Sequence, residues 1–276
     1  MAVDGSGNLY VSNALLNGNG NITVYSRKGQ LFRVLTGFRG GAYAIKFDRA
    51  GDLYVVSNRI FGCCEIQGYV TIFAPGATRP SRWLADTAAF PGKPAFDADG
   101  TYYQPNFYVF PGWISVYAPG ASSPSKFIRD GIGFPMAVTV DVYGQVYVLN
   151  NIFGGGTDVL LYPRNSASLI TTIQTGVVNA SAIAVDSNDE LYVANRGSGN
   201  IPASVTIYAP WMTTPWRTIH EGINEPVALA LDASGNLYVG NAPAAGPNTV
   251  SVYAPNTTTP EATYSLKYAP TAIIAP

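Results

Sequence analysis

Charge, histidine and cysteine are scarce in this sequence. Charged residues make up 12% of the 276 positions and the net charge is −1, whereas average soluble domains carry about 25% charged residues. Because Lys and Arg form no cluster, we expect neither nucleic acid nor an anionic membrane as the main partner. No apolar run approaches the ~18 residues that a membrane-spanning helix needs. The only cysteines are the adjacent pair Cys63 and Cys64, which offer no disulfide framework and no zinc-site spacing.

Turn residues and apolar residues, in contrast, are abundant. The chain has 29 Gly, 20 Pro and 47% hydrophobic residues, which indicates a folded chain with many turns rather than disorder. Met1 is followed at once by a structural repeat, and no signal peptide is visible in the sequence. The low charge and the adjacent cysteines favour a secreted or periplasmic bacterial protein, so we expect any leader to be missing from this chain.

One sequence pattern recurs along the whole chain. Its best copy is Ala228-Leu-Ala-Leu-Asp-Ala-Ser-Gly-Asn-Leu-Tyr-Val-Gly-Asn241. The copies are 44 to 49 residues apart when measured from their shared aspartate, which occurs at Asp4, Asp48, Asp97, Asp141, Asp186 and Asp232. Such periods are typical of repeat architectures. Six copies fill the chain and leave no segment for a second domain.

Each copy predicts four strands, called A to D. In most copies a short apolar strand A leads into an Asp-x-x-Gly turn, strand B reads Leu-Tyr-Val, and strand C reads Val-x-Val/Ile-Tyr and ends at an Ala-Pro pair. A shorter and more polar strand D follows. Four strands per ~45 residues is the spacing of a β-propeller blade. The prediction is an all-β, six-bladed β-propeller in one domain, with blades at 1–43, 44–93, 94–136, 137–181, 182–227 and 228–276.

Two rows of tyrosine accompany the repeat. One row lies on strand B and the other on strand C: Tyr10, Tyr54, Tyr147, Tyr192 and Tyr238, then Tyr25, Tyr117, Tyr162, Tyr208 and Tyr253. Aromatic residues that follow the repeat in this way are expected to fill the spaces between stacked blades.

The two ends of the chain compete for one place in the fold. Residues 272–275 read as a seventh strand A with nothing after it, while residues 1–3 already supply a first, short strand A. We expect the N- and C-terminal strands to close the ring together at blade 1. The duplication also suggests a piece of a longer repeat array.

The pattern Asp-x-x-Gly-Asn-Leu-Tyr-Val-x-Asn, followed by Val-x-Val-Tyr-Ala-Pro, resembles the NHL repeats in all six copies. The resemblance extends to the wider set of six-bladed propellers that includes the SMP-30/gluconolactonase and paraoxonase families. It implies the fold strongly and the function weakly, because these folds host lactonases, phosphotriesterases, lyases and binding modules.

The loops define one structural end and one variable end of each blade. The A–B turns are short and uniform, whereas the B–C loops differ in every blade, so we expect any ligand site at the end with the B–C and D–A loops. An asparagine closes strand B in all six copies, at Asn13, Asn58, Asn106, Asn150, Asn195 and Asn241. Six amides can bind a ligand together, or each can cap its own loop through the backbone.

Blade 3 departs most from the pattern. Gln104-Pro105 stands inside its strand B, where a proline removes a ladder donor, so that strand must bulge or end early. The aromatic residues that follow are candidates for the wall of a site for sugar or another flat ligand: Phe107, Tyr108, Phe110 and Trp113. The alternative is a loop that packs on its neighbours.

The remaining candidates are few. His220 lies beside Glu221 and Glu225 between blades 5 and 6, which is a weak candidate for a catalytic or metal group. Glu65 and Asp158 in two B–C loops are weak candidates for metal ligands. Cys63 and Cys64 either form a disulfide between neighbouring residues or remain thiols.

The resemblance also implies a calcium ion, which the enzymes among the similar families hold with Asn, Asp or Glu near the start of strand A. The matching positions here carry none of these residues: Tyr43, Lys93, Met136, Ser181, Val227 and Thr271. No cofactor is evident, and calcium or another divalent metal stays open.

Two functions therefore remain. The first is a monomeric binding propeller for a small molecule, glycan or protein, which contacts its partner with the B–C and D–A loops at the central channel. The second is a hydrolase of the lactonase or phosphotriesterase kind, with or without a divalent metal, at the same channel mouth. Whether the protein is an enzyme is left open.

Overall fold

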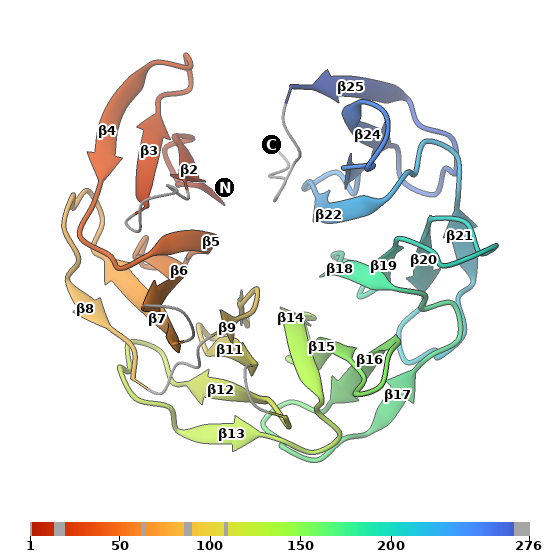
Figure 1. The fold of residues 1–276 in the computed structure, drawn as a ribbon, viewed down its shortest axis with the longest axis horizontal. Helices are drawn as coiled ribbons and strands as arrows, with labels where there is room; N and C mark the ends of the chain where they lie inside the picture. The colour runs from red at the N-terminus through yellow and green to blue at the C-terminus, as the bar shows by residue number, and fades with distance from the viewer. Residues whose placement is uncertain (1, 14–19, 62–64, 86–89, 108–109, 268–276) are drawn as a thin grey trace. The chain divides into compact units, whose positions relative to one another are not determined.

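The computed structural model describes residues 2–13, 20–61, 65–85, 90–107 and 110–267, and the regular elements in these ranges are all β-strands (Figure 1). The strands form six successive sheets, each ordered along the chain. The predicted fold class, a six-bladed β-propeller of four-stranded antiparallel blades, is thereby confirmed.

The chain divides into two compact units, Met1–Val138 (unit 1) and Thr139–Pro276 (unit 2). Unit 1 contains the first three blades. Blade 1 comprises β1 (Ala2–Val3), β2 (Leu9–Asn13), β3 (Asn21–Tyr25) and β4 (Leu31–Leu35). Blade 2 comprises β5 (Gly41–Phe47), β6 (Leu53–Phe61), β7 (Glu65–Phe73) and β8 (Arg82–Trp83). Blade 3 comprises β9 (Phe90–Pro91), β10 (Ala95–Phe96), β11 (Tyr102–Phe107), β12 (Trp113–Tyr117) and β13 (Lys126–Ile128).

Unit 2 contains most of blade 4 and all of blades 5 and 6. Blade 4 comprises β14 (Phe134–Val140), which begins in unit 1, then β15 (Val146–Asn151), β16 (Thr157–Tyr162) and β17 (Thr171–Ile173). Blade 5 comprises β18 (Ala180–Val185), β19 (Leu191–Asn195), β20 (Ser204–Tyr208) and β21 (Arg217–Ile219). Blade 6 comprises β22 (Pro226–Leu231), β23 (Leu237–Asn241), β24 (Asn248–Tyr253) and β25 (Ala262–Leu266).

The repeated aspartate builds the turn between strands A and B. In blade 6, Asp232 Oδ1 accepts hydrogen bonds from the backbone N–H groups of Ser234 and Asn236, at 2.9 and 2.8 Å. Gly235 then adopts a φ of +81°, a conformation that glycine reaches without strain. Blade 5 has Asp189 at the glycine position, and this residue adopts the same left-handed conformation with a φ of 63°. The uniform turn therefore follows from the aspartate more than from the glycine.

The core lies between neighbouring blades. In unit 1, β2 contacts β5, and buried apolar residues of blades 1 and 2 form one cluster. In unit 2, β18 contacts β22, and blades 5 and 6 share a second cluster. Most members of the two tyrosine rows are buried at 6% exposure or less, as predicted, while Tyr25 and Tyr238 are half-buried.

The predicted closure of blade 1 concerns residues at both ends. Ala2 and Val3 pair with Tyr10 and Leu9 as the first strand of blade 1. The C-terminal strand expected at 272–275 lies outside the described residues, so ring closure by this strand stays a prediction, as does the single domain over 1–276.

Candidate functional site

The six strand-B asparagines lie at the end of each blade that carries the B–C and D–A loops. Five of them are buried, with exposed fractions of 6% or less: Asn58, Asn106, Asn150, Asn195 and Asn241. Asn13 is half-buried. A side chain enclosed to this extent makes its hydrogen bonds inside the protein.

Asn195 holds the loop that leads into its own blade. Its Nδ2 group donates to the Gly176 carbonyl oxygen at 3.1 Å and to Thr206 Oγ1 at 3.0 Å. Its Oδ1 atom accepts the Val178 backbone N–H at 2.9 Å. The amide thereby fixes the D–A loop before blade 5 from both its donor and its acceptor side.

Asn241 repeats this arrangement in blade 6. Its Nδ2 group donates to the Gly222 carbonyl oxygen at 3.1 Å, and its Oδ1 atom accepts the Asn224 N–H at 3.0 Å. The identical contacts in two blades give the repeated asparagine a clear structural role there. Binding of a ligand by the six asparagines stays a prediction.

Asn150 is paired with another predicted residue. The two residues face each other across β15 and β16, and Asn150 Nδ2 donates to Asp158 Oδ1 at 2.9 Å. Asp158 is buried, and this burial raises the pKa of its carboxyl group. A buried carboxylate with one amide partner is a weak metal ligand by itself, because calcium takes six to eight oxygen atoms.

In blade 3, proline interrupts the partner of strand B rather than strand B itself. The strand β11 is continuous through Pro105, but its neighbour is split into β9, opposite Asn106 and Phe107, and β10, opposite Tyr102 and Tyr103. Because Pro105 has no N–H to donate, the segment between them turns away, and Lys93 bridges to Ala137 of β14.

The buried side chain of Gln104 stabilises this interruption. Its Nε2 group donates to the carbonyl oxygens of Gly92 and Pro105, at 3.1 and 2.8 Å. The N–H of Gly92 donates to the Pro105 carbonyl oxygen at 2.8 Å. The unusual Gln-Pro pair therefore accompanies the division of the inner strand of blade 3 into β9 and β10.

The aromatic residues after this pair make ring contacts at the same end of the blade. The rings of Phe107 and Phe90 stack with centroids 5.6 Å apart, and those of Phe110 and Phe134 lie 5.6 Å apart. Phe110 is 50% exposed. Tyr108 lies outside the described residues.

Trp113 forms a second contact group that includes a residue the sequence analysis missed. The guanidinium of Arg129 lies 5.1 Å from the ring of Trp113 and 5.3 Å from the ring of Phe127. Trp113 begins strand C, and Ile114 pairs with Ile128, so the antiparallel register places Arg129 beside Trp113. That register is the signal that would have identified Arg129. We call Trp113, Phe127 and Arg129, together with Phe110 of the B–C loop before Trp113, the blade 3 aromatic cluster; Phe110 is included for its place in that loop, and its ring contact is with Phe134.

Among the described residues, one hydrogen-bonding contact to the ring of the single histidine is found. His220 is exposed, and its Nδ1 atom lies 3.2 Å from the Ala203 carbonyl oxygen. Glu221 Oε2 accepts a hydrogen bond from Thr259, and Glu225 has a positive φ of 46°. Among the described residues, no three His, Cys, Asp or Glu side chains are grouped so that they could hold a metal ion.

Other predicted groups fall partly or fully outside the description. Cys63 and Cys64 lie outside the described residues, so their redox state stays a prediction. The backbone of Glu65 belongs to β7, where it pairs with Phe61, and its side chain lies outside the description.

The positions that match the calcium ligands of similar families coincide with a repeated distortion of strand A. The register shifts by one residue at Tyr43, Ser181 and Val227, in blades 2, 5 and 6. Bulges re-aim side chains and are frequent next to functional sites. The Ser181 hydroxyl, however, donates to the Pro226 carbonyl oxygen at 2.5 Å, which links two neighbouring inner strands.

Comparisons with known proteins extend the fold and leave the function open. No protein-family model and no curated protein matches the sequence. Among solved structures, hydrazine synthase of Kuenenia stuttgartiensis is similar with a TM-score of 0.72 and 17% identity, over 91% of this chain and 74% of that chain. A putative 6-phosphogluconolactonase from Bacteroides uniformis is similar with a TM-score of 0.65 and 15% identity, over 94% and 80%. At these identities the likeness shows the propeller fold, as the resemblance to the gluconolactonase-like propellers implies.

Proposed function

We propose that this protein is a binding propeller that contacts a protein or glycan partner with the loops at the B–C and D–A end of its blades. The observation that carries the proposal is the blade 3 aromatic cluster, in which Phe110 and Phe127 are 50% and 38% exposed and Arg129 stacks on Trp113. Trp and Arg are enriched among the residues that dominate binding energies, and aromatic faces also stack on sugars. Large side chains held in place before binding lose little entropy when a partner arrives.

The arrangement of the cluster supports a contact surface. Trp113 Nε1 donates to Ser115 Oγ at 3.0 Å, and Ser115 Oγ also accepts from Asn106 Nδ2 at 3.0 Å. The orientation of the tryptophan ring is thus fixed by a buried polar pair in strands β11 and β12. Arg129, which directly follows β13, lies over the ring, so a partner meets a preformed surface.

The variable composition of the neighbouring loops is consistent with this proposal. No helix among the described residues is long and apolar enough to span a membrane. The scarcity of charge in the whole chain favours a partner that is recognised by aromatic stacking and hydrogen bonding rather than by charge. We therefore favour a glycan or a weakly charged protein surface.

The test is binding of the purified protein to a glycan array and to a displayed peptide library. The variant Phe110→Ala/Arg129→Ala should lose about tenfold or more of the affinity for each ligand that the wild-type protein binds. The matched control is Tyr143→Ser, which removes a ring that is 62% exposed in the A–B turn of blade 4, and it should leave affinity unchanged within about twofold. Equal losses in both variants, or no ligand for the wild-type protein, would contradict the proposal.

A hydrolase is the second candidate, and it is supported by the similarity of the fold to the putative 6-phosphogluconolactonase. The test is turnover of 6-phosphogluconolactone and of an aryl phosphotriester, before and after treatment with a chelator. Two results together would favour the hydrolase over the binding propeller. They are turnover that the variant Phe110→Ala/Arg129→Ala retains, and no ligand on either the glycan array or the peptide library.

A further inference from the structure

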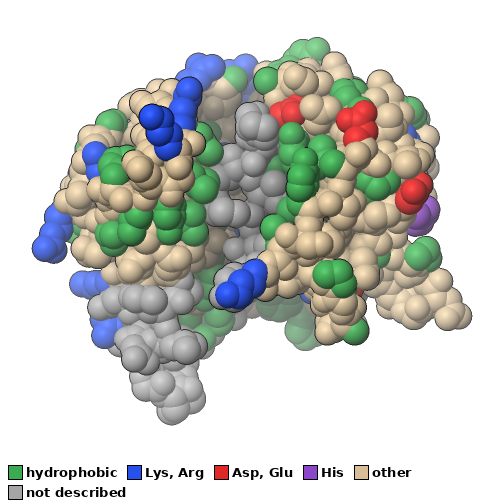
Figure 2. Space-filling view, turned by 90° about the horizontal axis from the view of Figure 1, so that it is seen from above, with side chains coloured by type: hydrophobic (Ala, Val, Ile, Leu, Met, Phe, Trp, Pro, Cys, Tyr) green, Lys and Arg blue, Asp and Glu red, His purple; other side chains and the backbone are tan. Residues whose placement is uncertain are grey.

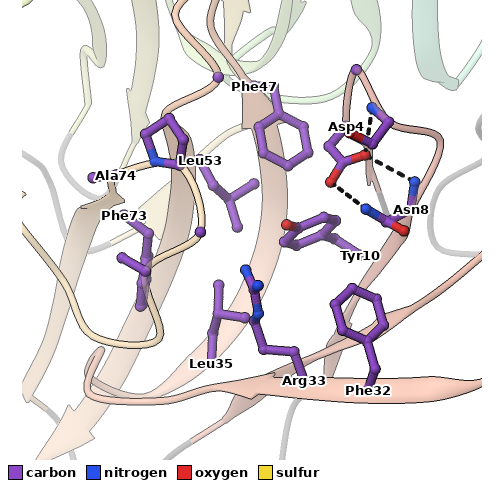
Figure 3. A pocket seen from close by; sticks show the side chains of 16 residues that line it. Asp4, Asn8, Tyr10, Phe32, Arg33, Leu35, Phe47, Leu53, Phe73 and Ala74 are labelled. Carbon is purple, nitrogen blue, oxygen red and sulfur yellow. Dashed lines mark hydrogen bonds between the residues drawn. The ribbon is translucent and has the colours of Figure 1, made fainter.

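A pocket of about 340 Å³ lies between blades 1 and 2, at the A–B turn end and away from the blade 3 aromatic cluster (Figure 3). It is lined by the turn Asp4–Asn8, the start of β4, and the turn after β7 at residues 74–77. Its volume is at the lower end of the range for small-molecule pockets. All of its walls belong to unit 1.

The pocket has an apolar floor. Leu35, Leu53 and Phe73 are each 2% exposed or less, and Tyr10 contacts Phe47 edge-to-face with ring centroids 4.9 Å apart. A ligand with a ring or a branched aliphatic body would bury its apolar surface there, which the hydrophobic effect favours.

One guanidinium points into this apolar space. In Figure 3 the side chain of Arg33 rises from β4 toward Tyr10, between Leu35 and Phe32. Its cation–π contact is with Phe32, with the guanidinium carbon 5.4 Å from the ring centroid. Among the described residues, Arg33 makes no hydrogen bond and no ion pair. Its charge is thus free to pair with a ligand.

Blade 2 shows the equivalent position between neighbouring blades, which we call the seam, with its arginine bound inside the protein. Arg82 of blade 2 occupies the strand D register of Arg33, because Arg82 pairs with Ile72 as Arg33 pairs with Val24. Arg82 donates to the Gly120 carbonyl oxygen of the next blade at 2.6 Å and to Tyr54 Oη at 3.1 Å. Its guanidinium bridges two blades and leaves no charge to bind a ligand.

An acidic partner accounts for the difference between the two seams. Arg82 lies 3.5 Å from Asp52 Oδ2, the fourth residue after the turn aspartate of blade 2. Blade 1 has Asn8 at that position, and Asn8 Nδ2 donates to Asp4 Oδ2 at 2.9 Å. Arg33 therefore lacks the carboxylate that fixes its counterpart.

Blade 5 follows the arrangement of blade 2. Its strand D arginine is Arg217, in register with Ile207, and the fourth residue after its turn aspartate is Glu190. Burial, foremost, raises the pKa of Glu190, while the positive charge of Arg217 opposes the rise. Two blades thus place an acid near the strand D arginine, as an ion pair in blade 2 and through the charge interaction in blade 5, whereas blade 1 has Asn8 at that position.

Asp4 does not supply the missing charge. Its Oδ1 atom accepts the N–H groups of Ser6 and Asn8, both at 2.9 Å, and its Oδ2 atom is held by the Asn8 side chain. Burial disfavours the ionised carboxyl group, but these hydrogen bonds and one from Tyr10 together lower its pKa. The carboxylate is fully used in building the turn.

The surroundings also favour an anion. Unit 1 contains twelve of the sixteen Lys and Arg residues and eight of the seventeen Asp and Glu residues. Figure 2 shows Lys and Arg side chains spread over the surface of unit 1. A positive surface raises the local concentration of anionic ligands.

We propose that the pocket between blades 1 and 2 binds a small organic carboxylate, with the carboxylate on Arg33 and an apolar or aromatic body on the floor formed by Leu35, Leu53 and Phe73. The free guanidinium can donate two parallel N–H groups to the two oxygens of a carboxylate, which a lysine cannot do. Because Asn8 stands at the position of the acid Asp52 in blade 2, the guanidinium of Arg33 stays available to a ligand.

The test uses phenylacetate, 3-phenylpropionate and indole-3-acetate as probes, with phenylacetamide as the neutral analogue, measured by calorimetry and ligand-detected NMR on the full chain. Arg33→Met keeps the apolar stem and removes the charge, and it should weaken carboxylate binding by about tenfold or more. Asn8→Asp restores the partner seen at Asp52 and should weaken binding by a similar factor. Arg82→Met is the matched control at the filled seam and should change binding by less than about twofold.

The results are decisive in both directions. Preference for phenylacetate over phenylacetamide that is lost in both Arg33→Met and Asn8→Asp, with circular dichroism unchanged, supports the site. The proposal is overturned if none of the three carboxylates binds the wild-type protein, if the neutral amide binds equally well, or if Arg82→Met abolishes binding as Arg33→Met does. Because the blade 3 aromatic cluster lies elsewhere, loss of its ligands in Phe110→Ala/Arg129→Ala would leave this binding intact.

Discussion

The role of the repeated asparagine can be tested most sharply at Asn195. The change Asn195→Ala removes donors to Gly176 and Thr206 and the acceptor for the Val178 N–H. Each neutral hydrogen bond contributes about 1 kcal/mol net, and a stranded buried donor costs about 1–3 kcal/mol. The Gly176 carbonyl oxygen keeps a hydrogen bond from Thr206 Oγ1 at 3.1 Å, so it is not left without a partner. We expect the free energy of unfolding to fall by about 2–4 kcal/mol.

The measurement is urea unfolding followed by circular dichroism, with the midpoint and slope fitted together. The matched control is Asn13→Ala, because Asn13 is half-buried and bonds within its own blade, to Asn21 and Thr23. That change should cost about 1 kcal/mol or less. The reasoning is refuted if Asn195→Ala costs less than about 0.5 kcal/mol, since the amide would then be dispensable for the loop.

Asn195→Asp adds a pH test of the same clamp. The aspartate still accepts the Val178 N–H but opposes the Gly176 carbonyl oxygen when it is ionised. Burial should raise its pKa, so the variant should be more stable at acidic pH and lose stability as the pH rises through that pKa. A variant with the same pH dependence as the wild-type protein would contradict the predicted contact with Gly176.

Two further substitutions test the turn ends and the backbone. Burial, foremost, and the charge of Asp189 raise the pKa of Asp141, whose Oδ2 atom has no hydrogen-bond partner and whose side chain is 4% exposed. Ionisation of Asp141 as the pH rises therefore lowers the stability of the fold. In urea unfolding, Asp141→Asn should stabilise the protein by about 1–2 kcal/mol at pH ~7 but not below pH ~4. An equal gain at both pH values would contradict this. Gly40 has a φ of +75°, and a Cβ there would overlap the Asn58 carbonyl oxygen, so Gly40→Ala should cost more than about 2 kcal/mol. Gly29→Ala, at the same φ with nothing within 4 Å, is the control and should cost about 1 kcal/mol in thermal unfolding.

The fold could be predicted from the sequence because one sequence pattern recurs six times. Every copy repeats the turn aspartate, and most copies repeat the Leu-Tyr-Val strand and the Ala-Pro pair, so the interpretation of one copy extends to the others. The buried tyrosine rows were predictable for the same reason. Tyr25 and Tyr238 are less buried than the other members, although Tyr10 and Tyr253 of the same two blades are buried.

The sites could be predicted only in part, because they depend on contacts between copies. Blade 3 attracted attention through Gln104-Pro105, but Arg129 became visible only when the register placed it over Trp113. Arg33 gave no signal in the sequence, since its free charge depends on the side chain of Asn8, which lies 25 residues earlier. A local motif search cannot detect a missing partner.

The open seam at blade 1 also explains how a repeat can gain a site at little cost to its stability. The Arg82–Asp52 pair that fills the equivalent seam has side chains 24% and 22% exposed, and exposed pairs of this kind contribute about 1 kcal/mol or less. Replacing the acid by asparagine, as at Asn8, loses at most that amount, because the asparagine strengthens the turn through its bond to Asp4. The apolar floor remains packed and the arginine is released. An amide in place of a carboxylate therefore leaves Arg33 without an acidic partner beside an apolar pocket, whereas the ion pair with Asp52 holds the equivalent Arg82 within blade 2.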